Sequence, residues 1–231
     1  MVLYIHTNVC NRGDKLARNK YPEITRARIL EAAQKLFTEK GWEETTVQDI
    51  VDELADVTRG AFYHHFQSKD DIIDAVTTKM FSGDFTSMID NNAILNLNGL
   101  NKLRNLISVS LANEGQLQFA KVAPSVLQSP IFIGKQLKDC VKVVAPYICQ
   151  CIEEGNQDGS LNVDHPKQAS ETFMILINLW MNPRIFTVTK EEYKSKIHHF
   201  KSMLDGIGLP VINDELFQLF EKYYDYVVQN D

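Results

Sequence analysis

Glycine, proline and cysteine are all scarce in this sequence, which contains 11, 7 and 4 of them in 231 residues. No apolar run approaches 18 residues and no strand-like alternation is present, so the chain is not collagenous, fibrous or membrane-spanning. The cysteines form no Cys-x-x-Cys motif, which disfavours a disulfide framework and favours a reducing, cytoplasmic location. The apolar run at residues 1–5 is too short for a secretory signal, so no export signal is expected.

The content of hydrophobic and charged residues indicates a globular protein with both signs of charge. Hydrophobic residues make up 44% and charged residues 23% of the chain, enough to bury a sizeable core and to exclude overall disorder. The 24 basic and 30 acidic residues give a net charge of −6. This net charge argues against a histone-like protein that binds nucleic acid over its whole surface. A local basic face remains compatible with the net charge. We expect an all-α fold.

Two helices are expected at the start of the patterned region. Apolar residues recur at helical spacing over about 25–40, between Thr25 as a cap and Gly41 as a stop. A short second helix begins at Thr46, whose hydroxyl can cap it while Asp49 reaches back in a variant of the capping box.

Two more helices follow at once. Residues 57–66 form the third, with Phe62 and Phe66 on one face, and the fourth begins at Ser68 with Asp71 at the reciprocal capping position. Beyond about residue 82 the pattern stays helical, with Gly155 to Gly159 among the breakers. The later helices are expected at 84–95, 99–114, 116–127, 131–155, 165–182, 190–206 and 213–229.

The second and third helices, joined by about three residues, have the form of a helix-turn-helix, in which the second helix enters the DNA major groove. The face opposite the two phenylalanines holds Arg59, Gly60, Tyr63 and His64. An arginine fork suits guanine or phosphate, glycine permits close approach, and tyrosine and histidine can donate to phosphate. Helix amino termini at Thr46, Thr58 and Lys69 add N–H groups and dipoles that attract phosphate.

The stretch from Thr25 through Phe81 resembles the TetR family of transcriptional regulators. The resemblance is carried by Thr45-Thr46-Val47-Gln48-Asp49-Ile50-Val51 and by Thr58-Arg59-Gly60-Ala61-Phe62-Tyr63-His64-His65-Phe66-Gln67-Ser68-Lys69-Asp70. It implies an amino-terminal DNA-binding unit and a larger helical body. It assigns operator contact to Thr46, Thr58, Arg59, Tyr63, His64 and Lys69, and close helix approach to Gly60.

One departure from the family pattern lies in the turn. Six residues separate Ile50 from Val57 where five are usual, and the usual glycine is replaced within Leu54-Ala55-Asp56. Asp56 tolerates a left-handed conformation and is expected to take the place of that glycine. The longer turn affects the angle between the two helices, and hence base specificity.

We divide the chain into three parts: a flexible basic arm at 1–23, a DNA-binding domain at 24–70 with the helix-turn-helix at about 46–66, and an effector-binding and dimerisation domain at 71–231. In the resembling family the last long helices pair across a two-fold axis. Residues expected at that interface are Phe173, Ile177, Trp180, Phe217, Phe220 and Tyr224. The alternative is that these side chains belong only to the internal core.

An apolar effector cavity is expected in the body. Its candidate residues are Phe85, Met88, Leu103, Ile107, Phe119, Met174 and Asn178, each equally well explained as core. Asn178 is either an interface hydrogen bond or a polar anchor for a ligand. The helix from Ser68 to Phe81 is expected to link this cavity to the reading helices.

Other chemistries find little support. No nucleophile motif, phosphate-binding glycine loop or paired carboxylates are present, so we expect no enzyme and no cofactor. Adjacent helical residues such as His64 and His65 diverge by about 100°, which disfavours a metal site. Cys140, Cys149 and Cys151 are interpreted as small apolar residues, with redox sensing as the alternative.

The leading hypothesis is a homodimeric repressor that binds an inverted-repeat DNA operator and leaves it when a small hydrophobic molecule binds the body. One alternative is a DNA-binding protein of the same fold that lacks a small-molecule effector and acts architecturally or through a protein partner. The other is a helical interaction module that does not touch DNA. No membrane partner is expected.

Overall fold

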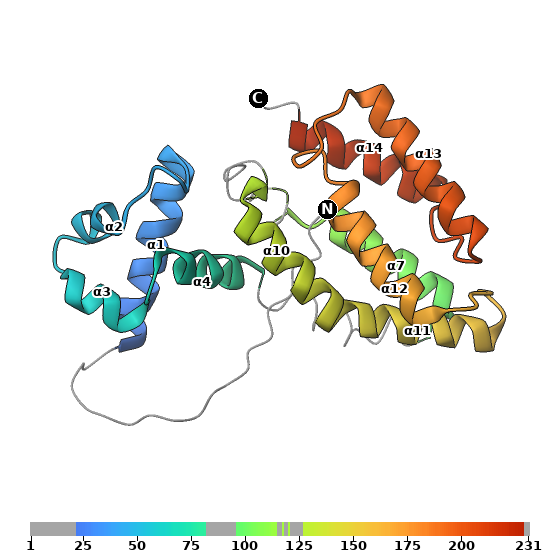
Figure 1. Cartoon of the computed structure of the whole chain (residues 1–231), viewed down its shortest axis with the longest axis horizontal. Coiled ribbons are helices and arrows are strands. Elements are labelled where there is room, and N and C mark those ends of the chain that lie inside the picture. Colours follow the sequence, from blue (N-terminus) through green and yellow to red (C-terminus); the bar gives the residue numbers. More distant parts are fainter. Residues whose placement is uncertain (1–21, 82–95, 115–116, 118–119, 121–126, 229–231) are drawn as a thin grey trace. The chain divides into compact units, whose positions relative to one another are not determined.

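The computed structural model describes residues 22–81, 96–114, 117, 120 and 127–228. Every regular element among these residues is a helix (Figure 1), which confirms the expected all-α class. The described residues up to Phe81 form one unit, and those from residue 96 onward form a second, larger one. In the described ranges no helix is both long and apolar enough to cross a membrane.

Four helices build the amino-terminal unit. They are α1 (Pro22–Lys40), α2 (Val47–Leu54), α3 (Arg59–His65) and α4 (Lys69–Phe81). α1 packs against α2 and α4, and α3 packs against α2. The core between them is apolar and includes Ile29, Ala33, Ile50, Phe62 and Ile72, all with no exposed surface.

Two boundaries in this unit differ from the sequence-based ones. α1 begins at Pro22 rather than near Thr25, because proline suits the first turn of a helix, where its missing N–H has no intrahelical partner. A domain boundary after residue 70 would cut α4, which packs on α1 and falls in the amino-terminal unit.

The carboxyl-terminal unit, the body, contains longer helical runs (Figure 1). Its elements are α7 (Gly99–Leu111), α10 (Pro130–Asp139), the π-helix η1 (Cys140–Val144), α11 (Ala145–Asp158), α12 (Pro166–Ile175), the π-helix η2 (Leu176–Trp180), α13 (Lys190–Gly206) and α14 (Asp214–Val228). α11 packs against α7 and α12, and α14 packs against α7 and α13. The expected helix at 84–95, and most of the one at 116–127, lie outside the described residues.

The helical run at 130–158 departs from the expected single helix at 131–155. Its middle turn, η1, widens just before Pro146, which has no N–H to donate and whose ring crowds the carbonyl four residues earlier. The run then passes through Gly155, which was expected to break it, and ends at Gly159, whose φ is +80°. Glycine at 155 serves packing instead: a Cβ added to Gly99 of α7 would lie 2.3 Å from the Gly155 nitrogen.

Candidate nucleic-acid interface

Thr46 caps the amino terminus of α2. Its hydroxyl oxygen accepts from the Asp49 N–H at 3.1 Å, while the Asp49 carboxylate accepts from the Thr46 N–H at 2.6 Å and from its hydroxyl at 2.7 Å. The reciprocal pair confirms the capping box expected from the sequence. Lys40 forms an ion pair with Asp49 at 2.7 Å. The hydrogen bond from Lys40, followed by those from Thr46, holds the pKa of Asp49 well below its ordinary value. The cap therefore fixes where α2 begins.

The turn between α2 and α3 differs from the expectation. The residue with positive φ is Ala55, at +54°, rather than Asp56. Asp56 instead accepts two hydrogen bonds from the Arg28 guanidinium of α1, at 2.7 and 2.9 Å. Ala55 therefore holds a conformation that a glycine would adopt at lower energy.

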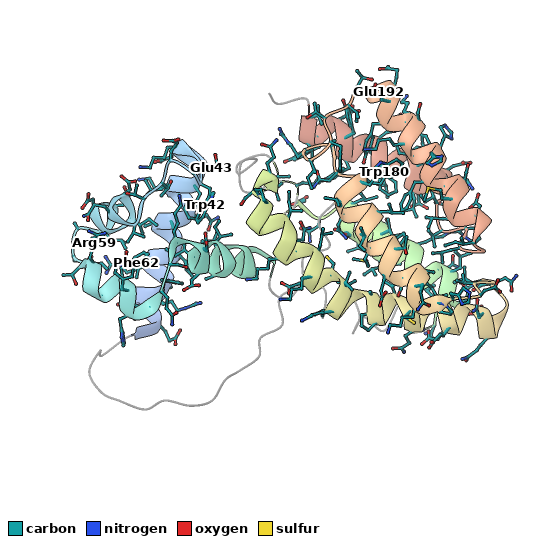
Figure 2. The ribbon with its side chains drawn as sticks, viewed as in Figure 1. Trp42, Glu43, Arg59, Phe62, Trp180 and Glu192 are labelled. Carbon is teal, nitrogen blue, oxygen red and sulfur yellow. The ribbon has the colours of Figure 1, made fainter. Side chains whose placement is uncertain are left out.

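α3 presents the side chains expected to read DNA. Thr58 caps the helix by accepting from the Ala61 N–H at 3.1 Å. Phe62 has no exposed surface, whereas Tyr63 is 47% exposed. The exposed positions at and beside this helix include Thr58, Arg59, Gly60, Tyr63 and His64. Figure 2 shows Arg59 at the outer edge of the unit and Phe62 on the inner side of the helix.

Gly60 is not needed for packing inside the protein. A Cβ added there would meet only the Thr58 hydroxyl oxygen within 4 Å, at 3.8 Å, and its φ is not in the left-handed region. The position is open toward the exterior, where a larger side chain would stand between α3 and an approaching surface. The expected role of Gly60 in close approach to DNA stays a prediction.

Lys69, at the amino terminus of α4, is held by the protein itself. Its Nζ lies 4.1 Å from the centre of the Trp42 ring and donates to the Glu43 carbonyl at 3.1 Å. Partial burial lowers its pKa from the ordinary lysine value. α4 has the expected cap, because the Ser68 hydroxyl accepts from the Asp71 N–H and the Asp71 carboxylate accepts from the Ser68 N–H.

The sequence raised two alternative kinds of site, a metal site and a redox-sensing cysteine. Among the residues that the structure describes, no group of three His, Cys, Asp or Glu side chains is arranged to hold a metal ion. Burial raises the pKa of Cys140 to about 12 and of Cys151 to about 11, which keeps these thiols protonated and unreactive. Cys149 is half-buried, and its thiol donates to Glu153.

Most of the expected interface residues are packed inside the body. Phe173 stacks on Phe200 with ring centres 5.9 Å apart, and Tyr224 lies 4.9 Å from Tyr193. The buried ones among the expected set are Phe173, Ile177, Phe220 and Tyr224, whereas Trp180 and Phe217 are half-buried. The four buried side chains fill this chain's own core, and their place at a dimer interface stays a prediction.

The expected effector residues that the structure describes are also core. Leu103, Ile107, Met174 and Asn178 are at most 2% exposed, and Asn178 donates to the Met174 carbonyl at 2.9 Å. Phe85, Met88 and Phe119 lie outside the described residues. An open groove of about 640 Å³ lies elsewhere on the body, between the segments 162–172 and 205–208, and none of the expected residues lines it.

Comparison with known proteins shows which family this chain belongs to. The model of bacterial regulatory proteins of the tetR family matches residues 29–76. The chain is 30% identical over 149 residues to the HTH-type transcriptional repressor KstR2 of Mycobacterium tuberculosis, covering 60% of this chain and 72% of KstR2. This chain belongs to the TetR family. The identity to the regulator TtgR of Pseudomonas putida is 50% over 52 residues, 22% of this chain and 24% of TtgR.

A solved TetR-family regulator from Pectobacterium atrosepticum has the same fold, with a TM-score of 0.55 at 22% identity, over 83% of this chain and 98% of that one. The family model describes bacterial regulatory proteins, and the matched relatives KstR2 and TtgR are transcriptional regulators. Its amino-terminal unit is a TetR-type helix-turn-helix domain. The chain spans only about a quarter of the length of the first relatives that it matches, TtgR among them.

Sequence reasoning missed the Arg28–Asp56 pair and the strained Ala55. Arg28 and Asp56 lie 28 positions apart, so no local pattern joins them. The one usable signal was the longer turn without glycine, which required some residue in it to take a positive φ.

Proposed function

We propose that this protein is a homodimeric transcriptional repressor that binds an inverted-repeat operator and is released by a small molecule bound in its body. The observation that carries the DNA-binding part is α3: a capped helix whose inner side is buried while its outer side exposes an arginine, a glycine, a tyrosine and a histidine. The major groove admits such a helix, and this set of side chains can contact base edges and phosphates.

The proposed contacts divide into two kinds. Arg59 would read a base edge, while Tyr63, His64 and the capped ends at Thr46 and Thr58 would meet the phosphate backbone. Lys69 would supply positive charge beside the backbone, either from its position over Trp42 or after leaving it. Gly60 would let α3 approach the groove closely.

The proposed dimer follows from the need to bind two half-sites about 34 Å apart, one with each recognition helix. Large apolar side chains remain exposed on and beside α13 and α14, among them Met203, Ile207 and Tyr226 at 38 to 46%. With half-buried Phe217 of α14 and Trp180 of η2, they would give this part of the body an apolar face for a second copy. Sedimentation of the purified chain at micromolar concentration tests this, and a well-folded monomer would count against it.

The proposed effector site lies within the body. RolR, whose fold is similar at a TM-score of 0.53 and 17% identity, was crystallised with resorcinol, a small aromatic molecule. Here, the buried Gln136 and Asn182 carry side-chain nitrogens without an acceptor, and α10, which holds Gln136, packs on η2 near Asn178. Such donors suit an effector with polar groups on an aromatic body. α4 would transmit its binding to the spacing of the two recognition helices.

Selection of duplexes from a random library by the intact protein tests this function. Enrichment of an inverted repeat, bound tightly and released by a compound that stabilises the free protein, is the expected result. Enrichment of a repeat that no stabilising compound releases would favour a regulator without a small-molecule effector. Failure to enrich any sequence would overturn the proposal.

A further inference from the structure

The amino-terminal unit is acidic, although it is the part that we propose binds DNA. Residues 22–81 contain seven lysines and arginines against twelve aspartates and glutamates. DNA binding draws much of its free energy from cations that neutralise phosphates, and a carboxylate held beside the backbone opposes it. The placement of each carboxylate near the recognition helix therefore matters more in this domain than in a basic one.

Three bases of α1 are paired with carboxylates of α2 and the turn. The pairs are Arg28–Asp56, Lys35–Glu53 and Lys40–Asp49, each closing at 2.7 Å. These pairs join α1 to α2 and to the turn that follows it. They neutralise carboxylates that would otherwise add to the negative charge of the unit.

The Arg28–Asp56 pair differs from the other two in geometry and place. It is bidentate: Nη1 donates to one carboxylate oxygen at 2.9 Å and Nη2 donates to the other at 2.7 Å. Asp56 lies two residues before Thr58, the cap of α3, in the turn that is one residue longer than the family pattern. Its side chain is 62% exposed. In a helix-turn-helix the first residues of the recognition helix enter the groove, so this turn lies close to the DNA backbone.

We propose that Arg28 acts as a charge-compensating residue for operator binding, by neutralising Asp56 at the entrance to the recognition helix. The inference rests on the proposed function. Arg28 acts through Asp56 and need not touch DNA itself. An exposed aspartate is charged at neutral pH, and the hydrogen bonds from Arg28 lower the pKa of Asp56 further.

A double-mutant cycle on the intact protein tests the inference, with an operator selected by the unmodified protein as the probe. Arg28→Gln is expected to weaken operator binding about tenfold, because it leaves a carboxylate facing phosphates. Asp56→Asn alone should bind as well as the unmodified protein or better. The double variant should return to within about threefold, and Arg28→Lys, which keeps the charge, should do the same.

Lys35→Gln is the matched control, because it opens an ion pair of the same length between α1 and α2, one turn before Asp56. It should change operator affinity less than about twofold, while its thermal unfolding shifts as little as that of Arg28→Gln, since exposed ion pairs stabilise folding weakly. The deficit of Arg28→Gln should also shrink as salt is raised, because screening weakens the repulsion.

The inference is overturned if Arg28→Gln binds like the unmodified protein, if Asp56→Asn fails to restore it, or if Lys35→Gln loses as much affinity. A lysine at position 28 that behaves like glutamine would overturn it too. Absence of DNA binding by the unmodified protein is a different result, since it rejects the proposed function itself.

Discussion

Side-chain caps set the starts of the short helices in the amino-terminal unit, whereas stacked rings and a close approach of two helix backbones join the long helices of the body. Thr46 and Thr58 fix the starts of α2 and α3 through hydrogen bonds to residues three positions later. In the body, by contrast, the Phe173 and Phe200 rings stack, and Gly99 meets Gly155 across 56 positions of sequence. The caps are local contacts, whereas these two contacts of the body join residues far apart in the sequence.

This difference explains why a short amino-terminal segment is shared with many regulators. A helix-turn-helix needs its caps, a few apolar positions and a free outer face, all of which a short pattern can specify. The body needs only a core that closes, which many combinations of side chains can provide. The match to TtgR accordingly covers 52 residues.

The largest effect is expected where two backbones of the body meet. Gly99→Ala would place a Cβ 2.3 Å from the Gly155 nitrogen and 2.4 Å from the Cys151 carbonyl oxygen, so α7 and α11 must separate. We expect a loss of about 3 kcal/mol in the free energy of unfolding. Chemical denaturation followed by circular dichroism measures it.

Gly134→Ala in α10 is the control for that change, because nothing lies within 4 Å of an added Cβ there. Alanine is the better helix residue, and this variant should gain about 0.5 to 1 kcal/mol. Equal effects of the two substitutions would show that backbone contact does not hold the body together.

The next effect concerns the exposed face of α3. Arg59→Ala should weaken binding to a selected operator by about 1 to 3 kcal/mol and relax the preference at one base pair, while thermal unfolding stays unchanged. Lys138→Ala, which removes an exposed positive charge from α10, is the matched control and should leave affinity as it was. If operator affinity survives the loss of Arg59, α3 is not the reading helix.

A smaller effect of opposite sign is expected in the turn. Ala55 has a φ of +54°, which costs an alanine about 1 kcal/mol relative to glycine. Ala55→Gly should therefore stabilise the protein by up to about 1 kcal/mol, less the extra entropy of glycine in the unfolded chain. Differential scanning calorimetry would detect the rise in melting temperature, and a fall would mean that this conformation carries no strain.

The smallest effect is the pH dependence of the α2 cap. The pKa of Asp49 is lowered in the folded state, so its contribution to stability is complete above the unfolded value of about 3.9 and is lost as pH falls through the folded value. The stability difference between the unmodified protein and Asp49→Asn should be constant from pH 7 to 5 and shrink below pH 4. A difference that grows on acidification would contradict this.

Features formed by residues close together in the sequence were predictable, whereas those that join distant residues were not. The capping boxes at Thr46 and Ser68 and the buried face at Phe62 were predictable, because each rests on residues three or four apart. The partner of Asp56 was not, since Arg28 comes from another helix.

In the described part of the body the helices were predictable, but the sequence could not separate interface positions from core positions. Phe220 and Phe173 occupy an all-apolar pattern that fits either role, and only the folded chain shows that both are covered from within. The role of Gly155 was equally hidden, because its reason is the backbone of Gly99.

The wide turn at η1 has a consequence for how this helix can be compared between relatives. A π turn accommodates one residue more than an α turn, and each residue of an α-helix advances the side chain by about 100°. The faces of α10 and α11 are therefore out of phase by one position, and a seven-residue pattern counted from Phe132 fails when carried on to Ile148. An alignment with a relative that has a regular α turn at Cys140–Val144 needs a one-residue gap there, because otherwise it pairs inward with outward positions in α11.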